Sequence, residues 1–292
     1  MNQWQIIAQQ IAQTTGEPFN PLEPRHVGGG CINTGLRLTD GERTFFVKLN
    51  SGALLDMFEA ESEGLSAMAQ TDTIRVPAPL CYGLSDTESY LVMEYIEMGH
   101  AGRSGSELAG RQLAAMHRFS QPSYGWFRDN TIGSTPQENQ SNDDWIDFWR
   151  EHRLGFQLRL AEGNGYGGSL QRKGEHLLDC FHVLIDHQPQ PSLLHGDLWG
   201  GNLAYTSEGD PVIFDPAVYY GDREADLAMT ELFGGFDNRF YDAYREAWPL
   251  APGYSTRKLL YNLYHILNHL NLFGGGYLGQ ALSMIDRLLA EV

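Results

Sequence analysis

The stretch His195-Gly-Asp-Leu-Trp-Gly-Gly-Asn202 decides how the rest of this 292-residue chain is interpreted. Asp197 and Asn202 are five residues apart within it, and Asp215 ends the apolar run that follows. A carboxylate can take a proton from a hydroxyl group, and carboxylate and amide oxygens are ligands that Mg²⁺ accepts alongside phosphate and water. Asp and Asn are also common turn residues, so an ordinary loop is the alternative interpretation.

The spacing favours phosphoryl transfer, because protein-kinase catalytic loops follow the pattern H-R-D-x-x-x-x-N. In that pattern the Asp accepts the proton of the attacking hydroxyl, and the Asn binds Mg²⁺. We therefore expect Asp197 to be the catalytic base. We expect Asn202 and Asp215 to be the metal ligands.

Composition indicates a folded globular protein, with 42% hydrophobic and 12% aromatic residues. No apolar run is long enough to span a membrane, and no signal peptide is evident. The three cysteines are widely spaced, which is typical of a reducing compartment, so we expect a cytoplasmic protein. The net charge of -17 disfavours nucleic acid and could favour an amine-bearing substrate. We expect no membrane partner, and a monomer or homodimer.

Three consecutive glycines lie between two strand-like runs near the N-terminus. Such a loop lets backbone N–H groups approach a phosphate, although a flexible hairpin turn is the alternative. We also hypothesise that the cysteine in this loop is sensitive to oxidation, while an inert buried thiol is an equal alternative. The loop residues expected to contact ATP are Gly28, Gly29, Gly30, Cys31 and Asn33.

Lys48 lies within a predicted strand over 44–49, flanked by apolar residues. A buried ammonium group needs a partner, because burying a lone charge is costly. A helix is predicted over 54–70, and Glu61 shares its apolar face by helical spacing. We expect Glu61 to pair with Lys48, unless Lys48 extends to solvent and Glu61 lies on the surface.

A further strand over 89–96 ends in Glu94, Tyr95 and Ile96, whose backbone groups would bind adenine as a kinase hinge does. We place the domain boundary there. Residues 1–96 would form an ATP-binding lobe, and 97–292 a helical catalytic and substrate-binding lobe.

Residues 120–142 are rich in polar residues and predict a long surface loop, and Asn142 or Asp143 would cap the next helix. Other helices are predicted over 106–119, 145–160, 175–187, 236–247 and 257–273.

The segment Tyr219 to Met229 contains several charged residues at the start of a predicted helix. Asp222 suits the N-cap position, and Asp226 lies one turn further, where it could bind backbone N–H groups of the catalytic loop. Arg223 would pair internally or face the substrate. A capped surface helix is the alternative.

Taken together, these motifs resemble the fructosamine kinase (ketosamine-3-kinase) family, within the group of aminoglycoside-phosphotransferase-like and choline-kinase-like enzymes. The resemblance covers nearly the whole chain. It implies an α+β, protein-kinase-like fold in two lobes, with a small antiparallel sheet and one main helix in the first and mostly helices in the second. The motifs are Gly28-Gly-Gly-Cys-Ile-Asn33, Phe46-Val-Lys48, Met57-Phe-Glu-Ala-Glu61, Leu91-Val-Met-Glu-Tyr95, His195 to Asn202, Phe214-Asp-Pro-Ala217, Tyr220-Gly-Asp-Arg-Glu-Ala-Asp226 and Leu272-Phe-Gly-Gly-Gly-Tyr277.

The resemblance also implies a function, ATP- and Mg²⁺-dependent phosphorylation of the 3-hydroxyl of ketosamines, leading to deglycation. The acceptor would be a ribulosamine, erythrulosamine or fructosamine adduct of an amine or of lysine. Lys48, held by Glu61, would position the phosphates, and His195 and Asp226 would support the loop. Trp199 would offer a flat face to the sugar or amine, unless it packs in the core. The substrate residues would be Trp199, Asp222, Arg223 and Tyr277.

Two other functions fit the same motifs. One is a kinase of another small hydroxylated amine, such as an aminoglycoside, choline or homoserine. The other is a nucleotide-binding pseudoenzyme, although Lys48, Asp197 and Asp215 are all present. A protein kinase is disfavoured, because Pro216-Ala217 follows Asp215 and no activation segment follows.

Overall fold

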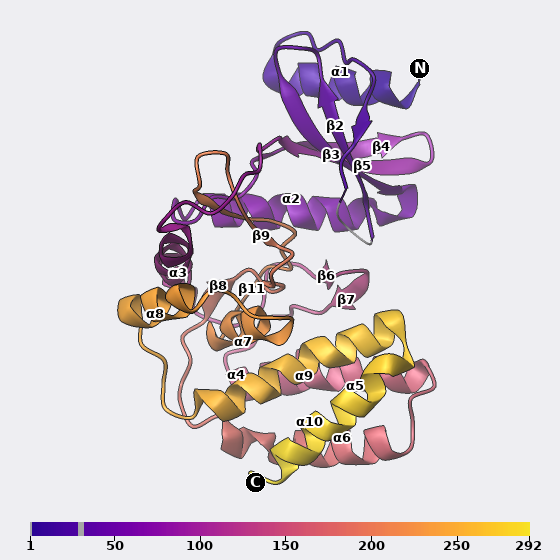
Figure 1. The fold of residues 1–292 in the computed structure, drawn as a ribbon. Coiled ribbons are helices and arrows are strands. Elements are labelled where there is room, and N and C mark those ends of the chain that lie inside the picture. The colour runs from indigo at the N-terminus through magenta and orange to yellow at the C-terminus, as the bar shows by residue number, and fades with distance from the viewer. Residues whose placement is uncertain (1, 29–31) are drawn as a thin grey trace. The chain divides into compact units, whose positions relative to one another are not determined.

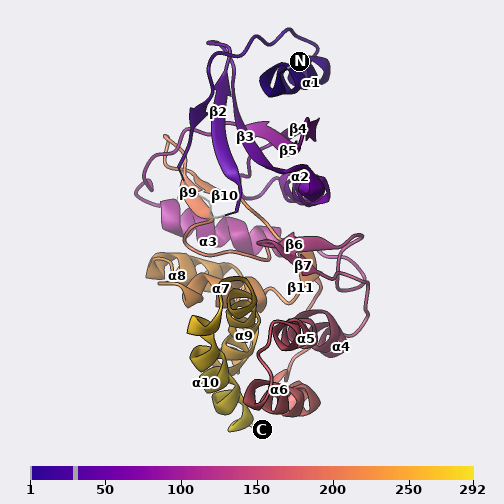
Figure 2. The same cartoon turned by 90° about the vertical axis from the view of Figure 1, so that its right-hand side faces the viewer.

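The computed structural model describes residues 2–28 and 32–292, and the chain divides into two compact units (Figures 1 and 2). The first unit contains Met1–Gly105 and Ala204–Asp215, and the second contains Ser106–Leu203 and Pro216–Val292. These bounds differ from the sequence-based boundary at 96/97. The segment 204–215 belongs to the first unit through backbone pairing that separate predictions of helices and strands do not reveal.

The first unit is built on a five-stranded antiparallel sheet with the strand order β1-β2-β3-β5-β4. Two helices accompany it, α1 (Gln3–Thr15) and α2 (Leu55–Ala69). The side chain of Asn2 caps α1 by accepting from the N–H of Gln5. The strands are β1 (Arg25–His26), β2 (Thr34–Thr39), β3 (Thr44–Ser51), β4 (Pro79–Ser85) and β5 (Glu88–Glu94).

Alternation along β3 explains where the two helices pack. Val47 and Leu49 are buried in one cluster with Ile7 and Ile11 of α1. Lys48 lies between them in sequence, so its side chain points to the opposite face of the sheet. There it meets Glu61 of α2. The helices α1 and α2 therefore cover opposite faces of β3.

The segment 204–215 joins the first unit through main-chain hydrogen bonds. The strands β9 (Leu203–Tyr205) and β10 (Pro211–Ile213) form a hairpin. The N–H of Ile213 donates to the carbonyl of Arg75 at 3.0 Å, and the N–H of Ser207 donates to that of Glu97 at 2.9 Å. This attachment places Asp215, directly after β10, in the same unit as Lys48.

The second unit is mostly helical. Its large core contains Trp149, Phe181, Tyr261 and Ile285, contributed by helices that are distant in sequence. The helices are α3 (Gly105–Met116), α4 (Trp145–Trp149), α5 (Phe156–Gly163), α6 (Ser169–Cys180), α7 (Glu224–Leu232), α8 (Asn238–Ala247), α9 (Tyr254–Phe273) and α10 (Leu278–Leu289). The short strands are β6 (Asn130–Ile132), β7 (Thr135–Gln137), β8 (Ser192–Leu194) and β11 (Tyr219–Gly221).

Several local features differ from the sequence-based expectations. The region 120–142 contains the β6–β7 hairpin, whose short polar strands carry no clear alternating pattern. Asp144, rather than Asn142 or Asp143, caps α4 by accepting from the N–H of Asp147. The predicted helix over 145–160 is interrupted by a π-helical turn at Arg150–Gly155. The helix α6 begins at Ser169, earlier than the expected position 175.

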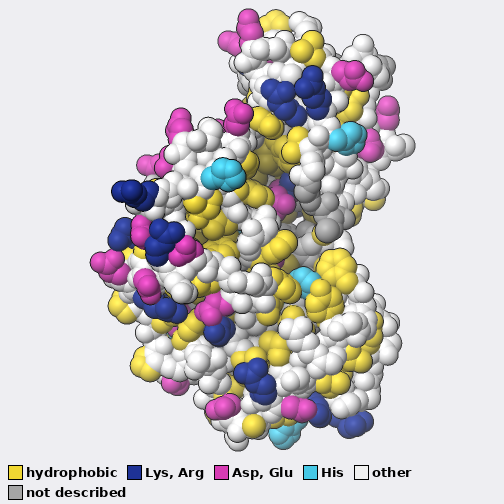
Figure 3. Space-filling view, viewed as in Figure 1, with side chains coloured by type: hydrophobic (Ala, Val, Ile, Leu, Met, Phe, Trp, Pro, Cys, Tyr) yellow, Lys and Arg dark blue, Asp and Glu magenta, His cyan; other side chains and the backbone are white. Residues whose placement is uncertain are grey.

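Among the described helices, none combines the length and the apolar character that crossing a membrane requires. On the face drawn in Figure 3, acidic and basic side chains are interspersed.

Candidate active site

In the first unit, Lys48 is bound by two carboxylates. Its Nζ donates to Glu61 Oε1 at 2.5 Å and to Asp215 Oδ1 at 2.6 Å. The expected pairing of Lys48 with Glu61 is therefore present. Burial alone would lower the pKa of Lys48, but the charges of Glu61 and Asp215 outweigh it and raise the pKa overall. The lysine is a fixed cation in a buried position, which suits an anionic ligand such as a phosphate.

Asp215 adopts an unusual backbone conformation at the end of β10. Its φ of 58° lies in the left-handed region, which residues other than glycine rarely adopt. Such a conformation costs on the order of 1 kcal/mol, and it persists where the surroundings impose it. The side chain of Asp215 is 43% exposed, whereas that of Lys48 is 7% exposed. Asp215 thus presents a carboxylate to solvent while one of its oxygens holds Lys48.

The other expected ATP-binding residues of the first unit are only partly described. Gly29, Gly30 and Cys31 lie outside the described residues, and with them the redox hypothesis for Cys31. Gly28 precedes the gap, and Asn33 Oδ1 accepts a hydrogen bond from Asn50 Nδ2 at 2.7 Å.

At the end of β5, the Glu94 carboxylate binds Arg75 at 2.6 Å, and the Tyr95 ring lies under the Arg37 guanidinium. Ile96 is buried. The adenine-binding role of these three residues depends on their backbone groups and remains a proposal.

In the second unit, the catalytic loop is fixed by its own hydrogen bonds. Asn202 Nδ2 donates to the carbonyl of Asp197 at 2.8 Å, and the N–H of Asp197 donates to His195 Nδ1 at 3.2 Å. Gly196 has a φ of 82°, and a Cβ there would lie 2.0 Å from the carbonyl oxygen of Ala217. Only glycine fits that position.

Asp226 of α7 holds this loop by hydrogen bonds to its backbone. Its carboxylate accepts from the N–H of His195 at 2.7 Å and from that of Gly196 at 2.8 Å. These are the contacts expected from the sequence. His117, at the end of α3, lies 3.1 Å from Asp226. Burial would raise the pKa of Asp226, but the hydrogen bond from His117 and the nearby charges outweigh it and lower the pKa.

Further hydrogen bonds fix the orientation of His117. Arg223 donates to the hydroxyl of Tyr244 at 3.1 Å, and that hydroxyl lies 2.8 Å from His117 Nδ1. Because the Asp226 carboxylate can only accept, His117 Nε2 carries a proton and donates it to Asp226. Hydrogen bonds thus connect Arg223 through Tyr244, His117 and Asp226 to the backbone of the catalytic loop.

Asp222 and Arg223 are buried, with 1% and 9% exposure, which argues against the expected contact with substrate. Arg223 also donates to the carbonyls of Trp248 and Pro249. Asp222 accepts from the N–H of Glu224 at 3.0 Å and from the hydroxyl of Tyr261 at 2.6 Å. The N-cap residue of α7 is Arg223, however, rather than the expected Asp222. We therefore assign Asp222 and Arg223 structural roles and no longer propose them as substrate residues.

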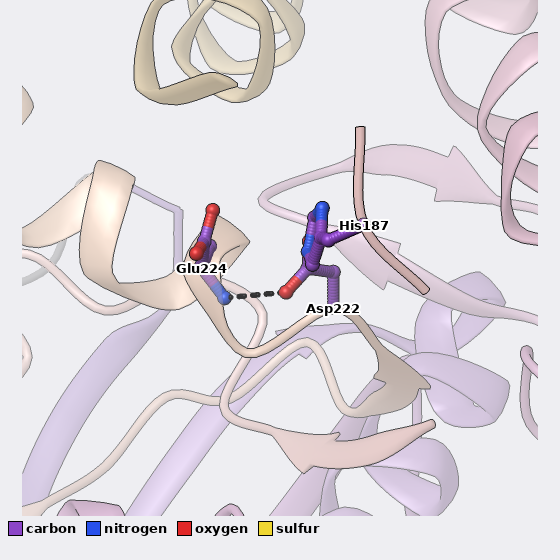
Figure 4. Close-up of side chains that lie close together, drawn as sticks. All are labelled: His187, Asp222 and Glu224. Atoms are coloured by element: carbon purple, nitrogen blue, oxygen red, sulfur yellow. Dashed lines mark hydrogen bonds and ion pairs between the residues drawn. The ribbon is translucent and has the colours of Figure 1, made fainter. Parts of the chain in front are cut away.

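His187, Asp222 and Glu224 lie close together (Figure 4), within the spacing of metal ligands. Their carboxylate oxygens are already engaged, however. Arg257 donates to both oxygens of Glu224, at 2.7 and 3.1 Å. His187 Nε2 lies 2.9 Å from Asp222. Because Arg257 already supplies a positive charge, we interpret the group as an internal ionic network and propose no metal there.

An aromatic cluster extends from the catalytic loop, and we define it as Trp199, Phe233, His269, Phe273 and Tyr277. The rings of Trp199 and Phe233 are 6.2 Å apart, and Phe233 and His269 are 4.8 Å apart. His269 in turn contacts Phe273 and Tyr277, at 5.4 and 5.2 Å. Trp199 and Tyr277, the two aromatic residues expected at the substrate site, thus belong to one cluster.

Trp199 is 39% exposed and Phe273 is 59% exposed, so the cluster has an open face. A Cβ at Gly201 would lie 2.3 Å from the Trp199 ring, so glycine there lets the ring lie across the loop. Sequence reasoning missed Phe233, His269 and Phe273. His269 and Phe273 are four residues apart in sequence, a spacing that predicts neighbouring side chains on one face of a helix.

The fold and these residues define a phosphotransferase of the protein-kinase-like class, with an alcohol group as acceptor. The fructosamine kinase family model matches residues 3–291, and the chain belongs to this family. A probable ketoamine kinase of Synechocystis sp. is 54% identical over 287 residues, covering 98% of this chain and 97% of that protein. A chloroplastic protein-ribulosamine 3-kinase of Arabidopsis thaliana is 47% identical over 280 residues, covering 94% and 85%.

A crystal structure of a putative fructosamine-3-kinase from Haemophilus somnus matches with a TM-score of 0.90. It is 30% identical and covers 99% of this chain and 98% of that one. The expected α+β, protein-kinase-like fold with a small antiparallel sheet is confirmed. The expected family and the expected enzyme class are confirmed as well.

Proposed function

We propose that this protein is an ATP- and Mg²⁺-dependent ketosamine 3-kinase whose product leads to deglycation. The observation that carries the proposal is the buried Lys48, held between Glu61 and Asp215. The names of the relatives, ketoamine kinase and protein-ribulosamine 3-kinase, support a ketosamine as the acceptor.

The residues of the first unit suit a nucleotide. Lys48 would bind phosphate oxygens, and the Gly28–Gly30 loop would cover them with backbone N–H groups. Asp215 of this unit has a hard oxygen ligand that suits Mg²⁺, and Asn202 of the second unit has another. When bound, Mg²⁺ supplies positive charge that offsets the charge on the transferred phosphoryl group.

The residues of the second unit suit a hydroxylated amine. Asp197 would orient the 3-hydroxyl of the sugar and take its proton as the oxygen attacks the γ-phosphorus, with ADP as the leaving group. The open face of Trp199 offers a surface for the sugar ring or for the cationic amine. Tyr277 and His269 lie in the same aromatic cluster and would limit the size of the acceptor.

A substrate panel tests the proposal. ATP consumption would be measured in the presence of Mg²⁺ with ribulosamine-lysine, fructosamine-lysine, kanamycin and choline, using Asp197→Asn as the inactive control. We expect turnover on a ketosamine, with ³¹P–¹H NMR locating the new phosphate on the 3-hydroxyl and the free amine appearing afterwards. The activity should fall by about 10²–10⁴-fold in the Asp197→Asn variant.

Two results would contradict the proposal in different ways. Turnover on kanamycin or choline alone would retain the phosphotransferase chemistry and exclude a ketosamine as the acceptor. Binding of ATP without turnover on any acceptor would support a pseudoenzyme instead.

A further inference from the structure

The β6–β7 hairpin lies beside β11 (Figure 2) and binds the chain between Asp215 and β11 through two side-chain amides. Gln137 Nε2 donates to the carbonyl of Ala217 at 3.0 Å, and Asn130 Nδ2 donates to that of Val218 at 2.8 Å. Asn130 and Gln137 are paired residues of the hairpin, so their side chains lie on the same face. The hairpin therefore holds two successive main-chain carbonyls.

The carbonyl of Ala217 lies directly against the catalytic loop. Its oxygen would be 2.0 Å from a Cβ at Gly196, so it packs against the Cα of the residue that precedes Asp197. The N–H of Ala217 donates to the carbonyl of His195 at 2.8 Å. Ala217 thus contacts both residues that precede Asp197, and Gln137 holds its carbonyl.

The orientation of each amide is determined by the group that it faces. A main-chain carbonyl can only accept, so the NH₂ groups of Gln137 and Asn130 point to their carbonyl partners. Asn130 Oδ1 then accepts from Gln137 Nε2 and from Asn139 Nδ2, both at 2.8 Å. The Tyr264 hydroxyl donates to Gln137 Oε1 at 2.8 Å. Gln137 is 1% exposed, and both its amide nitrogen and its amide oxygen are therefore bonded within the fold.

A buried arginine anchors the other side of this network. Arg153 is 0% exposed and lies in the π-helical turn Arg150–Gly155, a type of turn that is frequent at functional sites. Its guanidinium donates to Asn139 Oδ1 at 2.8 Å and to the carbonyl of Glu138 at 2.6 Å. Its Cζ lies 4.0 Å from the centre of the Tyr219 ring. A cation is costly to bury, so its donation to Asn139 is a firm anchor for the hairpin.

We propose that Gln137 is a positioning residue for the catalytic base and acts through Ala217. The inference rests on the proposed function, in which Asp197 takes the proton of the acceptor hydroxyl. Gln137 holds the carbonyl that packs against Gly196, and it thereby fixes the backbone from which the Asp197 side chain extends. Without that donor the buried carbonyl is left unpaired and shifts towards another partner. The carboxylate of Asp197 then departs from the geometry that proton transfer requires.

Single-turnover kinetics of Gln137→Met with a ketosamine acceptor test the proposal. Methionine nearly keeps the shape of the side chain and removes its hydrogen bonds. We expect the rate of phosphoryl transfer to fall by about 10- to 100-fold, because a small misplacement of a catalytic group has an effect of that size. The affinity for MgADP should change by less than about twofold, because the nucleotide phosphates would bind Lys48 in the first unit.

Gln171→Met is the matched control. Gln171 also donates through its side-chain amide to two main-chain carbonyls, those of Leu158 and Tyr166, at 2.9 and 3.1 Å. It lies on α6, outside the network around Gln137. Both variants should lower the free energy of unfolding, whereas only Gln137→Met should slow phosphoryl transfer. The comparison separates positioning from a general loss of stability.

Tyr264→Phe is a milder variant that removes only the hydroxyl bound to Gln137 Oε1. We expect it to slow phosphoryl transfer by about 3- to 10-fold, the effect of one hydrogen bond. Combined with Gln137→Met, it should have little further effect, because the residue that it orients is already absent. Additive effects of the two changes would show that Tyr264 does not act through Gln137.

Amide exchange gives a readout that needs no turnover. The N–H of Ala217 should exchange faster in Gln137→Met than in Gln171→Met, because Ala217 is held less firmly against His195. Equal rates of phosphoryl transfer in these two variants would overturn the proposal, and so would equal exchange at Ala217. If the unmodified protein turned over no acceptor, the proposed function would fail, and exchange alone would decide whether Gln137 holds the loop.

Discussion

Lys48 is a buried ammonium group held by two carboxylates of the first unit, Glu61 and Asp215. Its pKa is raised, so this contribution to stability is complete near neutral pH and is lost only at strongly alkaline pH. At neutral pH Lys48 is therefore charged, and its effect on activity depends on where its ammonium group is held.

Replacing Glu61 tests that positioning. Glu61→Gln keeps the size of the side chain and removes one of the two negative charges that hold the Lys48 ammonium group. We expect kcat/KM for ATP to fall by roughly 10- to 100-fold, because Lys48 is no longer held in one geometry. Glu59→Gln is the matched control, since Glu59 lies on the same helix and bonds the Tyr82 hydroxyl at the exposed surface. Unchanged ATP kinetics in Glu61→Gln would exclude the positioning role.

His265 of α9 is a buried, uncharged histidine. Burial lowers its pKa to about 3, and its Nδ1 has no partner among the described residues. The unfolded chain takes up a proton near pH 6.5, whereas the folded chain does not. The stability due to neutral His265 is thus present above pH 6.5 and is lost as the pH falls.

The free energy of unfolding should fall by about 2 kcal/mol between about pH 7.5 and pH 5 because of His265. This amount hardly depends on the pKa of His265 in the folded chain, as long as that pKa is below about 4. Urea unfolding at both pH values measures it. In His265→Gln the pH dependence should shrink by this amount. In His176→Gln, which changes an exposed histidine of α6, it should not change. Equal pH dependence in both variants would contradict the assignment.

At the scale of elements, α7 holds the catalytic loop through one side chain, Asp226. Asp226→Asn removes the charge that pairs with His117 and leaves only one good acceptor for two N–H groups. We expect a loss of about 3 kcal/mol in unfolding free energy, together with faster amide exchange at His195 and Gly196. Asp242→Asn, at an exposed position on α8, should change neither quantity. Slow exchange in Asp226→Asn would show that the loop is held by other contacts.

The elements also show what the sequence could predict. Lys48, Glu61 and Asp226 were placed correctly, because strand alternation and helical spacing determine which side of an element a residue occupies. The burial of Asp222 and Arg223 was not predictable, because their partners Tyr261 and Tyr244 come from α9 and α8.

The aromatic cluster depends on comparably distant contacts. Trp199 could be proposed from its loop, whereas Phe233 and His269 reach it only through the packing of α7 against α9. Local patterns carry no information on which distant helices will meet.

At the scale of the whole molecule, the net charge of -17 creates a negative potential around the protein. Such a potential attracts cations and raises their rate of association, and salt screens it over about 10 Å at 0.1 M. A ketosamine carries a cationic amine, so its approach should be assisted at low salt. The effect depends on the net charge of the acceptor rather than on its sugar.

Two acceptors with the same sugar separate this effect from changes in chemistry. The ribulosamine of Nα-acetyl-lysine amide is a net cation, and the ribulosamine of glycine is a zwitterion. With ATP saturating, kcat/KM for the cation should fall about three- to fivefold from about 20 to about 300 mM NaCl. The zwitterion should change much less, because its opposite charges nearly cancel at a distance. Since kcat reports on the bound complex, it should be almost independent of salt for both. Equal salt dependence for the two acceptors would mean that the charge of the molecule serves solubility alone.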